Sequence, residues 1–180
     1  MFVKPWSLVI RGLMALVLAL ITGKWPAMSL RSLLLVFGGY ALVDGLVAMA
    51  GAMRSAESGK RWTPLIVEGV TGILTAFAAF SWPSPFDLSV TYLIAAWALV
   101  TGVLEVMTGL RLRKSLAGEW LLTLSGFSSI TLGILMLTIR VAADVARLVG
   151  IYAFIFGIML LALGFRLRPW LKRPAIGAPL

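Results

Sequence analysis

Long apolar segments dominate the sequence, and six of them are long enough to cross a membrane. Each holds about 20 residues, the length that spans the roughly 30 Å hydrocarbon core of a bilayer as a helix. The residue alternation that barrel strands require, at a spacing of about ten residues, is not found. The pattern therefore predicts six transmembrane helices, over residues 6–23, 32–52, 63–81, 88–110, 119–138 and 145–165.

One short pattern recurs in every second segment. It consists of an aromatic residue, Ala, two large apolar residues, one variable residue and Gly, as in YALVDG (40–45), WALVTG (97–102) and YAFIFG (152–157). An arginine follows each of the three glycines after nine residues. A Trp-Pro corner precedes the first two copies at matching distances, whereas the third has Ile139-Arg140 there and has diverged.

These spacings predict one transmembrane domain, residues 1–180, in which a two-helix hairpin is repeated three times. Each unit crosses the membrane twice, so all three have the same orientation and are related by an axis along the membrane normal. The fold class is an all-α integral membrane protein, with a pseudo-threefold ring of hairpins expected and a linear row as the alternative. The repeats cover 6–54, 62–114 and 120–168, and a flexible cytoplasmic tail, 169–180, follows.

The recurring pattern also predicts how the helices pack. In each copy Ala and Gly are four residues apart, so two small residues lie on one helix face and allow close backbone contact in lipid. The aromatic residues beside them, Tyr40, Trp97 and Tyr152, are expected to add bulk next to that contact. The predicted packing pairs are Ala41 and Gly45, Ala98 and Gly102, and Ala153 and Gly157.

Composition excludes several classes of protein. Hydrophobic residues make up 61% of the chain, charged residues 13%, and the mean hydropathy is +1.01, so too few polar residues exist to cover a water-soluble fold. The sequence contains no cysteine and no histidine, which removes disulfides, thiol chemistry and the commonest general base and metal ligand. We therefore predict no enzymatic activity, no catalytic or metal-binding residues and no cofactor.

The net charge of +9 is distributed unevenly along the chain. Eleven basic residues flank the apolar segments on one side of the membrane and four on the other, so the positive-inside rule places both termini in the cytoplasm. Such clusters suit anionic lipid headgroups on the cytoplasmic side, and no basic stripe long enough to bind nucleic acid is present. A homo-oligomer remains an open alternative. The eleven are Lys4, Arg54, Lys60, Arg61, Arg111, Arg113, Lys114, Arg166, Arg168, Lys172 and Arg173.

Three features of the sequence resemble the HdeD family of small bacterial inner-membrane proteins. They are the two-span repeats with Gly-rich first helices, the corners KWP (24–26) and SWP (81–83), and the arginine nine residues after each second-helix glycine. The resemblance extends over about 6–168, and the third corner departs from it. It implies a multi-pass protein of the bacterial inner membrane, linked to acid or envelope stress resistance. The family brings no established catalytic motif.

Four charged residues lie inside the predicted spans and are the candidate functional residues. At 1.5 Å per helical residue, Arg11, Glu68 and Glu105 lie about 8–9 Å inside the membrane and Asp44 lies near the midplane at about 15 Å. A charge at the bilayer centre costs at least about 2.5–3.5 kcal/mol, so each should face protein or water.

Three interpretations of this cluster remain open. Arg11 can pair with Glu68 or Glu105 and join neighbouring hairpins, a carboxylate can titrate to sense acid or relay a proton, or Arg11 can extend to the lipid headgroups. Our hypothesis is that Arg11 pairs with Glu68, and that Glu105 is the free, titrating group.

Two classes of function follow from these features. The prolines lie at the ends of spans rather than at midspan, where transporters break their helices, which favours a non-enzymatic, stress-related membrane protein. The alternative is a small transporter or channel that uses intramembrane carboxylates for proton or solute passage, and Asp44 near the midplane favours it.

Overall fold

Six long helices make up the computed structural model of the protein. The structure describes residues 5–25, 29–57, 62–81, 87–112, 119–138 and 142–171. All six helices are long and apolar enough to cross a membrane, and each contains one predicted span. The helices are α1 (Pro5–Lys24), α2 (Leu30–Glu57), α3 (Thr63–Ser81), α4 (Asp87–Leu112), α5 (Glu119–Thr138) and α6 (Ala142–Leu171).

The structure describes some of the helix ends that the sequence predicted. α1 ends at Lys24, and the Trp25 amide donates a last hydrogen bond to the Ile21 carbonyl at 3.1 Å. Pro26, the second corner at 82–83 and the diverged corner at 139–140 lie outside the described residues. The tail predicted from residue 169 starts too early, because α6 continues to Leu171. Pro169 lacks a backbone N–H donor, but it lies in the last turn of α6, so the helix includes it. The remainder of the predicted tail, 172–180, is outside the described residues.

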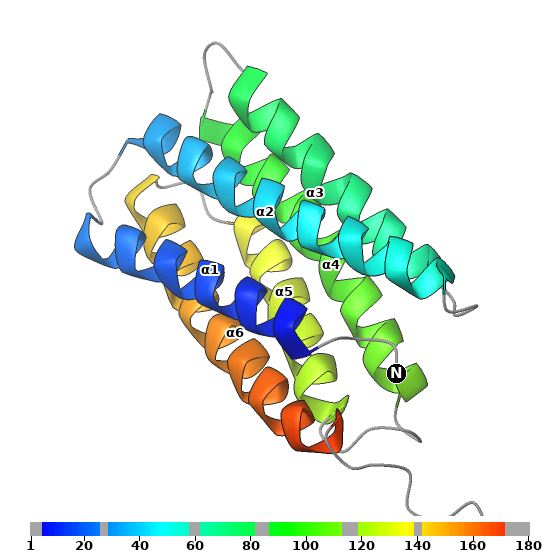
Figure 1. The fold of residues 1–180 in the computed structure, drawn as a ribbon. Helices are drawn as coiled ribbons and strands as arrows, with labels where there is room; N and C mark the ends of the chain where they lie inside the picture. Colours follow the sequence, from blue (N-terminus) through cyan, green and yellow to red (C-terminus); the bar gives the residue numbers. More distant parts are fainter. Residues whose placement is uncertain are drawn as a thin grey trace, which may run out of the picture.

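The closest helix pairs join different hairpins. α2 packs on α3, α4 packs on α5, and α6 packs on α1, whereas the two helices within each hairpin are in looser contact. Figure 1 shows α1 and α6 side by side, although they lie at opposite ends of the sequence. The contact between α6 and α1 closes the ring, because a linear row of hairpins would leave these two helices apart.

Glycines from two successive units meet at each of the three closest contacts. A Cβ atom added to Gly45 would lie 2.8 Å from the Gly69 carbonyl oxygen, and one added to Gly69 would lie 3.0 Å from the Gly45 oxygen. The Gly102–Gly126 contact between α4 and α5 gives 2.8 and 2.7 Å in the same way. These distances mean that the paired backbones touch and that no side chain fits between them.

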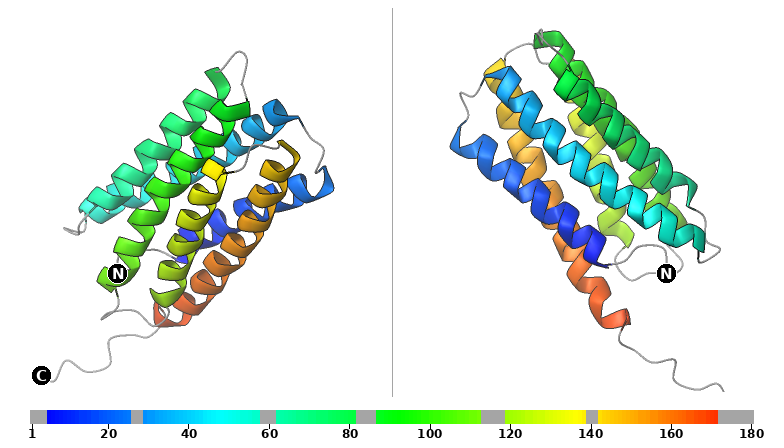
Figure 2. Two further views of the ribbon diagram at one scale, coloured as in Figure 1. Left: turned by 180° about the vertical axis from the view of Figure 1, so that it is seen from behind. Right: turned by 45° about the horizontal axis from the view of Figure 1, so that its top comes forward.

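The third contact of this kind joins the first and last helices. Cβ atoms added to Gly12 and Gly157 would each lie 2.9 Å from the opposite carbonyl oxygen. The structure therefore places the glycine of every predicted packing pair against a first-helix glycine. Figure 2 shows the same pairing of α1 with α6 and of α4 with α5 from other directions.

The two surfaces of the ring differ in what they expose. Large apolar side chains such as Leu20 and Phe77 point outward and are 65% and 70% exposed, as a lipid-facing surface requires. The tryptophans Trp6, Trp62 and Trp120 are exposed near the starts of α1, α3 and α5, where an aromatic belt lies at a membrane interface. The inward faces bury both apolar residues and a group of charges.

Candidate functional site: a buried ion cluster

All four predicted charged residues point into the ring. Arg11 on α1, Asp44 on α2, Glu68 on α3 and Glu105 on α4 are 6%, 1%, 5% and 3% exposed. Three of them directly precede a glycine that packs against another helix. The helix contacts that bring these glycines together also direct the preceding side chain towards the interior, because successive residues of a helix are only about 100° apart.

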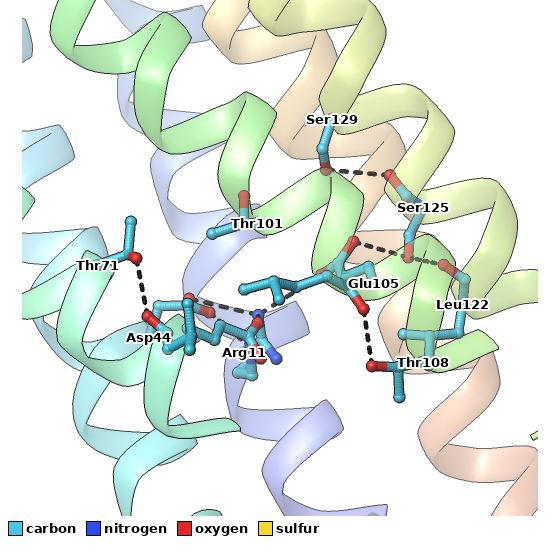
Figure 3. A network of polar contacts seen from close by, with 12 residues as sticks. Arg11, Asp44, Thr71, Thr101, Glu105, Thr108, Leu122, Ser125 and Ser129 are labelled. Atoms are coloured by element: carbon cyan, nitrogen blue, oxygen red, sulfur yellow. Dashed lines mark hydrogen bonds and ion pairs between the residues drawn. The ribbon is translucent and has the colours of Figure 1, made fainter. Parts of the chain in front are cut away.

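Arg11 is the centre of the cluster. Its Nε donates to Asp44 Oδ1 at 2.5 Å and its Nη2 donates to Asp44 Oδ2 at 3.3 Å. Nη2 also donates to Glu68 Oε1 and lies 3.5 Å from Glu105 Oε1. A guanidinium has five N–H donors in one plane and suits this sharing among carboxylates. One cation thus joins α1, α2, α3 and α4 (Figure 3).

The structure contains the expected ion pair of Arg11 with Glu68 and gives Arg11 two further carboxylate neighbours. Asp44, for which no partner was predicted, is held by two hydrogen bonds from Arg11. Depth along a helix places the backbone only, and the long arginine side chain covers the remaining distance. The hypothesis that Glu105 is a free, titrating group is wrong in its first part, since the side chains of Glu105 and Arg11 are 3.5 Å apart; its second part stays a prediction.

Hydroxyl groups of α5 complete the polar side of the cluster. Ser125 Oγ lies 2.9 Å from the Leu122 carbonyl oxygen and 3.2 Å from Glu105 Oε2, and its one hydroxyl hydrogen can be donated to either of them. One turn further along, Ser129 Oγ and the Tyr152 hydroxyl are 2.8 Å apart. Figure 3 shows the serines beside the Glu105 side chain. The polar contacts therefore extend from the first two hairpins into the third.

The aromatic residues of the repeated pattern, expected to add bulk beside the packing contact, lie next to the cluster. The Trp97 ring lies edge-on to Phe37 and Tyr40, with centroids 5.2 and 5.6 Å apart. The Tyr40 hydroxyl and the Trp97 Nε1 are buried and have no hydrogen-bond partner among the described residues. In the sequence, these aromatic residues are recognisable because one of them directly precedes the packing alanine in each copy of the pattern.

Equivalent repeat positions carry different chemistry around the axis. Arg11, Glu68 and Ser125 each precede the first-helix glycine of their unit, and all three are buried. Asp44 and Thr101 hold equivalent places on α2 and α4, where Thr101 donates to the Trp97 carbonyl at 2.8 Å. The corresponding residue of the third unit is the buried Phe156. The backbone is thus repeated, while the charges belong to the first two units.

The cluster lies nearer one end of the ring than the other. Arg11 is six residues from the start of α1, which is about 9 Å along the helix. Towards the opposite end, large apolar side chains that are at most 1% exposed fill the interior, including Phe37, Ile94, Met136 and Val149. Within the described residues, the buried charged side chains all belong to the cluster around Arg11.

The carboxylates of the cluster face a guanidinium rather than a common empty centre. In the part of the chain that the structure describes, no group of three or more Asp, Glu, His or Cys side chains is placed to hold a metal ion. What the arrangement offers chemically is a set of proton acceptors around one fixed positive charge.

Comparison with known protein families gives two matches to one family. Residues 10–70 and 67–138 match the short repeat of unknown function, DUF308. The chain belongs to the DUF308 family. The two DUF308 matches begin in the first and second hairpins, and the second match ends with α5, before the diverged corner of the third unit. Comparisons with curated proteins and with solved structures gave no match.

Proposed function

We propose that this DUF308 protein is a non-enzymatic protein of the bacterial inner membrane that contributes to resistance to acid or envelope stress. The HdeD family, which the repeat pattern resembles, also belongs to DUF308. The observation that carries the proposal is the ion cluster, in which Arg11 contacts three carboxylates inside a ring that is otherwise mainly apolar.

The cluster links the packing of the ring to the proton concentration. Asp44 and Glu68 accept hydrogen bonds from Arg11, and protonation of both carboxylates would leave the buried guanidinium without a compensating negative charge. Loss of one partner of a buried ion pair typically costs about 3–5 kcal/mol. Strong acid therefore loosens the contacts among α1, α2 and α3 and gives the protein a response to acid.

The orientation belongs to the same proposal. The excess of basic residues beside the starts of the odd-numbered helices puts both termini in the cytoplasm, with anionic lipid headgroups as partners on that side. The ion cluster then lies closer to the cytoplasmic face. The bundle works as a monomer or as a homo-oligomer, and no nucleic acid or cofactor takes part.

A small transporter or channel is the second candidate function, and the intramembrane carboxylates favour it. Passage through the ring would have to cross the half that Phe37, Ile94, Met136 and Val149 fill. The close glycine contacts around the ring also resist the opening that a solute needs. These two features support the non-transporting role.

Acid survival of the source bacterium tests the proposed function. A strain that lacks the gene should survive acid less well than its parent, and the wild-type gene should restore survival. Arg11→Met should not restore it, whereas Arg31→Met, which changes an exposed arginine at the start of α2, should. The amount of each variant in the membrane is measured in parallel. Equal acid and envelope-stress survival with and without the gene would reject the proposed function.

A further inference from the structure

We propose that Glu105 is a proton-binding site, which carries a proton on Oε2 and donates it to the Ser125 hydroxyl. The inference rests on the proposed function for its biological meaning, because it assigns the proton that the cluster already holds before strong acid reaches Asp44 and Glu68. Its test below is made on the purified protein and does not depend on any survival assay.

The charge count of the cluster requires more positive charge than Arg11 supplies. Three carboxylates lie within 3.5 Å of its guanidinium, so three negative charges and one positive charge would leave an excess of two. Each uncompensated charge deep in a membrane costs at least about 2.5–3.5 kcal/mol. Carboxylates that share a site do not all ionise, and one of them retains a proton.

The contacts of Arg11 identify Glu105 as the carboxylate that holds the proton. Asp44 accepts two hydrogen bonds from Arg11, and Glu68 accepts one directly from Nη2. Such charge-assisted bonds stabilise the anion. Glu105 Oε1 is 3.5 Å from Nη2 and is buried without a hydrogen-bond partner among the described side chains. Glu105 is thus the acid whose anion receives the least stabilisation.

The hydroxyl of Ser125 locates the proton on one oxygen. A serine hydroxyl has a single hydrogen, and Ser125 Oγ is nearer to the Leu122 carbonyl, at 2.9 Å, than to Glu105 Oε2, at 3.2 Å. When that hydrogen is donated to Leu122, the contact with Oε2 lacks a hydrogen unless the carboxyl group supplies it. A protonated Glu105 donates from Oε2 to Ser125 Oγ and completes a chain of two hydrogen bonds.

The other groups around Glu105 also disfavour a third anion. Arg11 on α1 is the positive group that faces it, while Asp44 on α2 and Glu68 on α3 face it with negative charge. Tyr40 on α2 and Tyr152 on α6 face it as neutral phenols. One proton on Glu105 reduces the excess from two negative charges to one, which Asp44 and Glu68 share through their bonds with Arg11.

The proposed proton site lies nearer one end of the ring. Glu105 is seven residues from the end of α4, about 10 Å along the helix, on the side where α1 begins. Apolar residues such as Phe37 and Ile94 fill the opposite half. The site is therefore closer to one side of the membrane, the cytoplasmic side in the proposed orientation.

Infrared spectroscopy of protein labelled with ¹³C at the glutamate carboxyl groups tests the inference. A protonated carboxyl group absorbs at a different frequency from a carboxylate, and the label separates the glutamate bands from the aspartate bands. At neutral pH the wild-type protein should show a protonated glutamate band. The band should be absent in Glu105→Gln, which is isosteric with the neutral acid and is therefore expected to keep the fold. It should persist in the control Glu57→Gln, which changes an exposed glutamate at the end of α2.

A further variant tests the hydrogen bond to Ser125. Ser125→Ala removes the acceptor, so the band should remain and shift to higher frequency because the carboxyl O–H is no longer bonded. Absence of a protonated glutamate band in the wild-type protein, or its persistence in Glu105→Gln, would overturn the inference. Neither result would decide the proposed function, which the acid-survival assay tests separately.

Discussion

Replacing Gly102 with alanine introduces a methyl group where α4 and α5 are in backbone contact. The new Cβ would lie 2.8 Å from the Gly126 carbonyl oxygen and 2.9 Å from the Ile130 backbone nitrogen. Both neighbours are main-chain atoms, so the two helices must separate. Overpacking of this kind typically costs about 1–3 kcal/mol, which lowers the melting temperature of a protein of this size by roughly 2–12 °C.

Gly39 of α2 provides the matched control for this prediction. A Cβ atom added there meets nothing within 4 Å, so Gly39→Ala should be neutral or stabilising by up to about 0.5–1 kcal/mol through helix propensity. Thermal unfolding of both variants in the same detergent, followed by circular dichroism, measures the difference. If Gly102→Ala melts at the same temperature as Gly39→Ala, the helix contact is not as close as described.

The same comparison at Gly12 tests whether the ring is closed. Its added Cβ would lie 2.9 Å from the Gly157 carbonyl oxygen on α6, so Gly12→Ala should destabilise the protein as much as Gly102→Ala. In a linear row of hairpins Gly12 would be at an edge, and Gly12→Ala would behave like the Gly39 control.

Two further predictions concern topology and the ion cluster. A reporter that is active only in the cytoplasm should be active when fused at Ser58 or Leu116 and silent at Ser84, and activity at Ser84 would overturn the proposed orientation. Arg11→Met should melt at a lower temperature at neutral pH than the exposed-site control Arg31→Met, because it leaves the buried carboxylates without their cation, a loss that typically costs about 3–5 kcal/mol; equal melting temperatures of the two variants would contradict the buried ion contacts.

The sequence predicted the helices well because membrane spans follow from apolar length. It also marked the glycines of the second helices through their spacing from alanine. It did not show which helices are closest in space, since neighbours within a hairpin are not the tightest pairs. The first helices were recognised only as Gly-rich, because the contacts of glycines such as Gly12 and Gly126 depend on which helices face each other in space.

The candidate site was predicted in its members and only partly in its pairing. Burial of a charge in an apolar segment identifies Arg11 and the three acids, because each needs a polar partner. Axial depth separated Asp44 from Arg11 by about 7 Å at 1.5 Å per residue, and the arginine side chain spans that distance. The contact of Glu105 with Ser125 depends on how α4 and α5 face each other, which residue spacing does not give.

A double-mutant cycle between Arg11 and Glu68 tests the central claim, that one buried cation joins the helices of separate hairpins. Arg11→Met, Glu68→Gln and the double variant are unfolded in the same detergent, and their free energies of unfolding are compared. Arg11 Nη2 donates a hydrogen bond to Glu68 Oε1, so the account predicts that the double variant is more stable than the sum of the single losses implies, by about 1–3 kcal/mol. Additive losses, within about 0.5 kcal/mol, would contradict it.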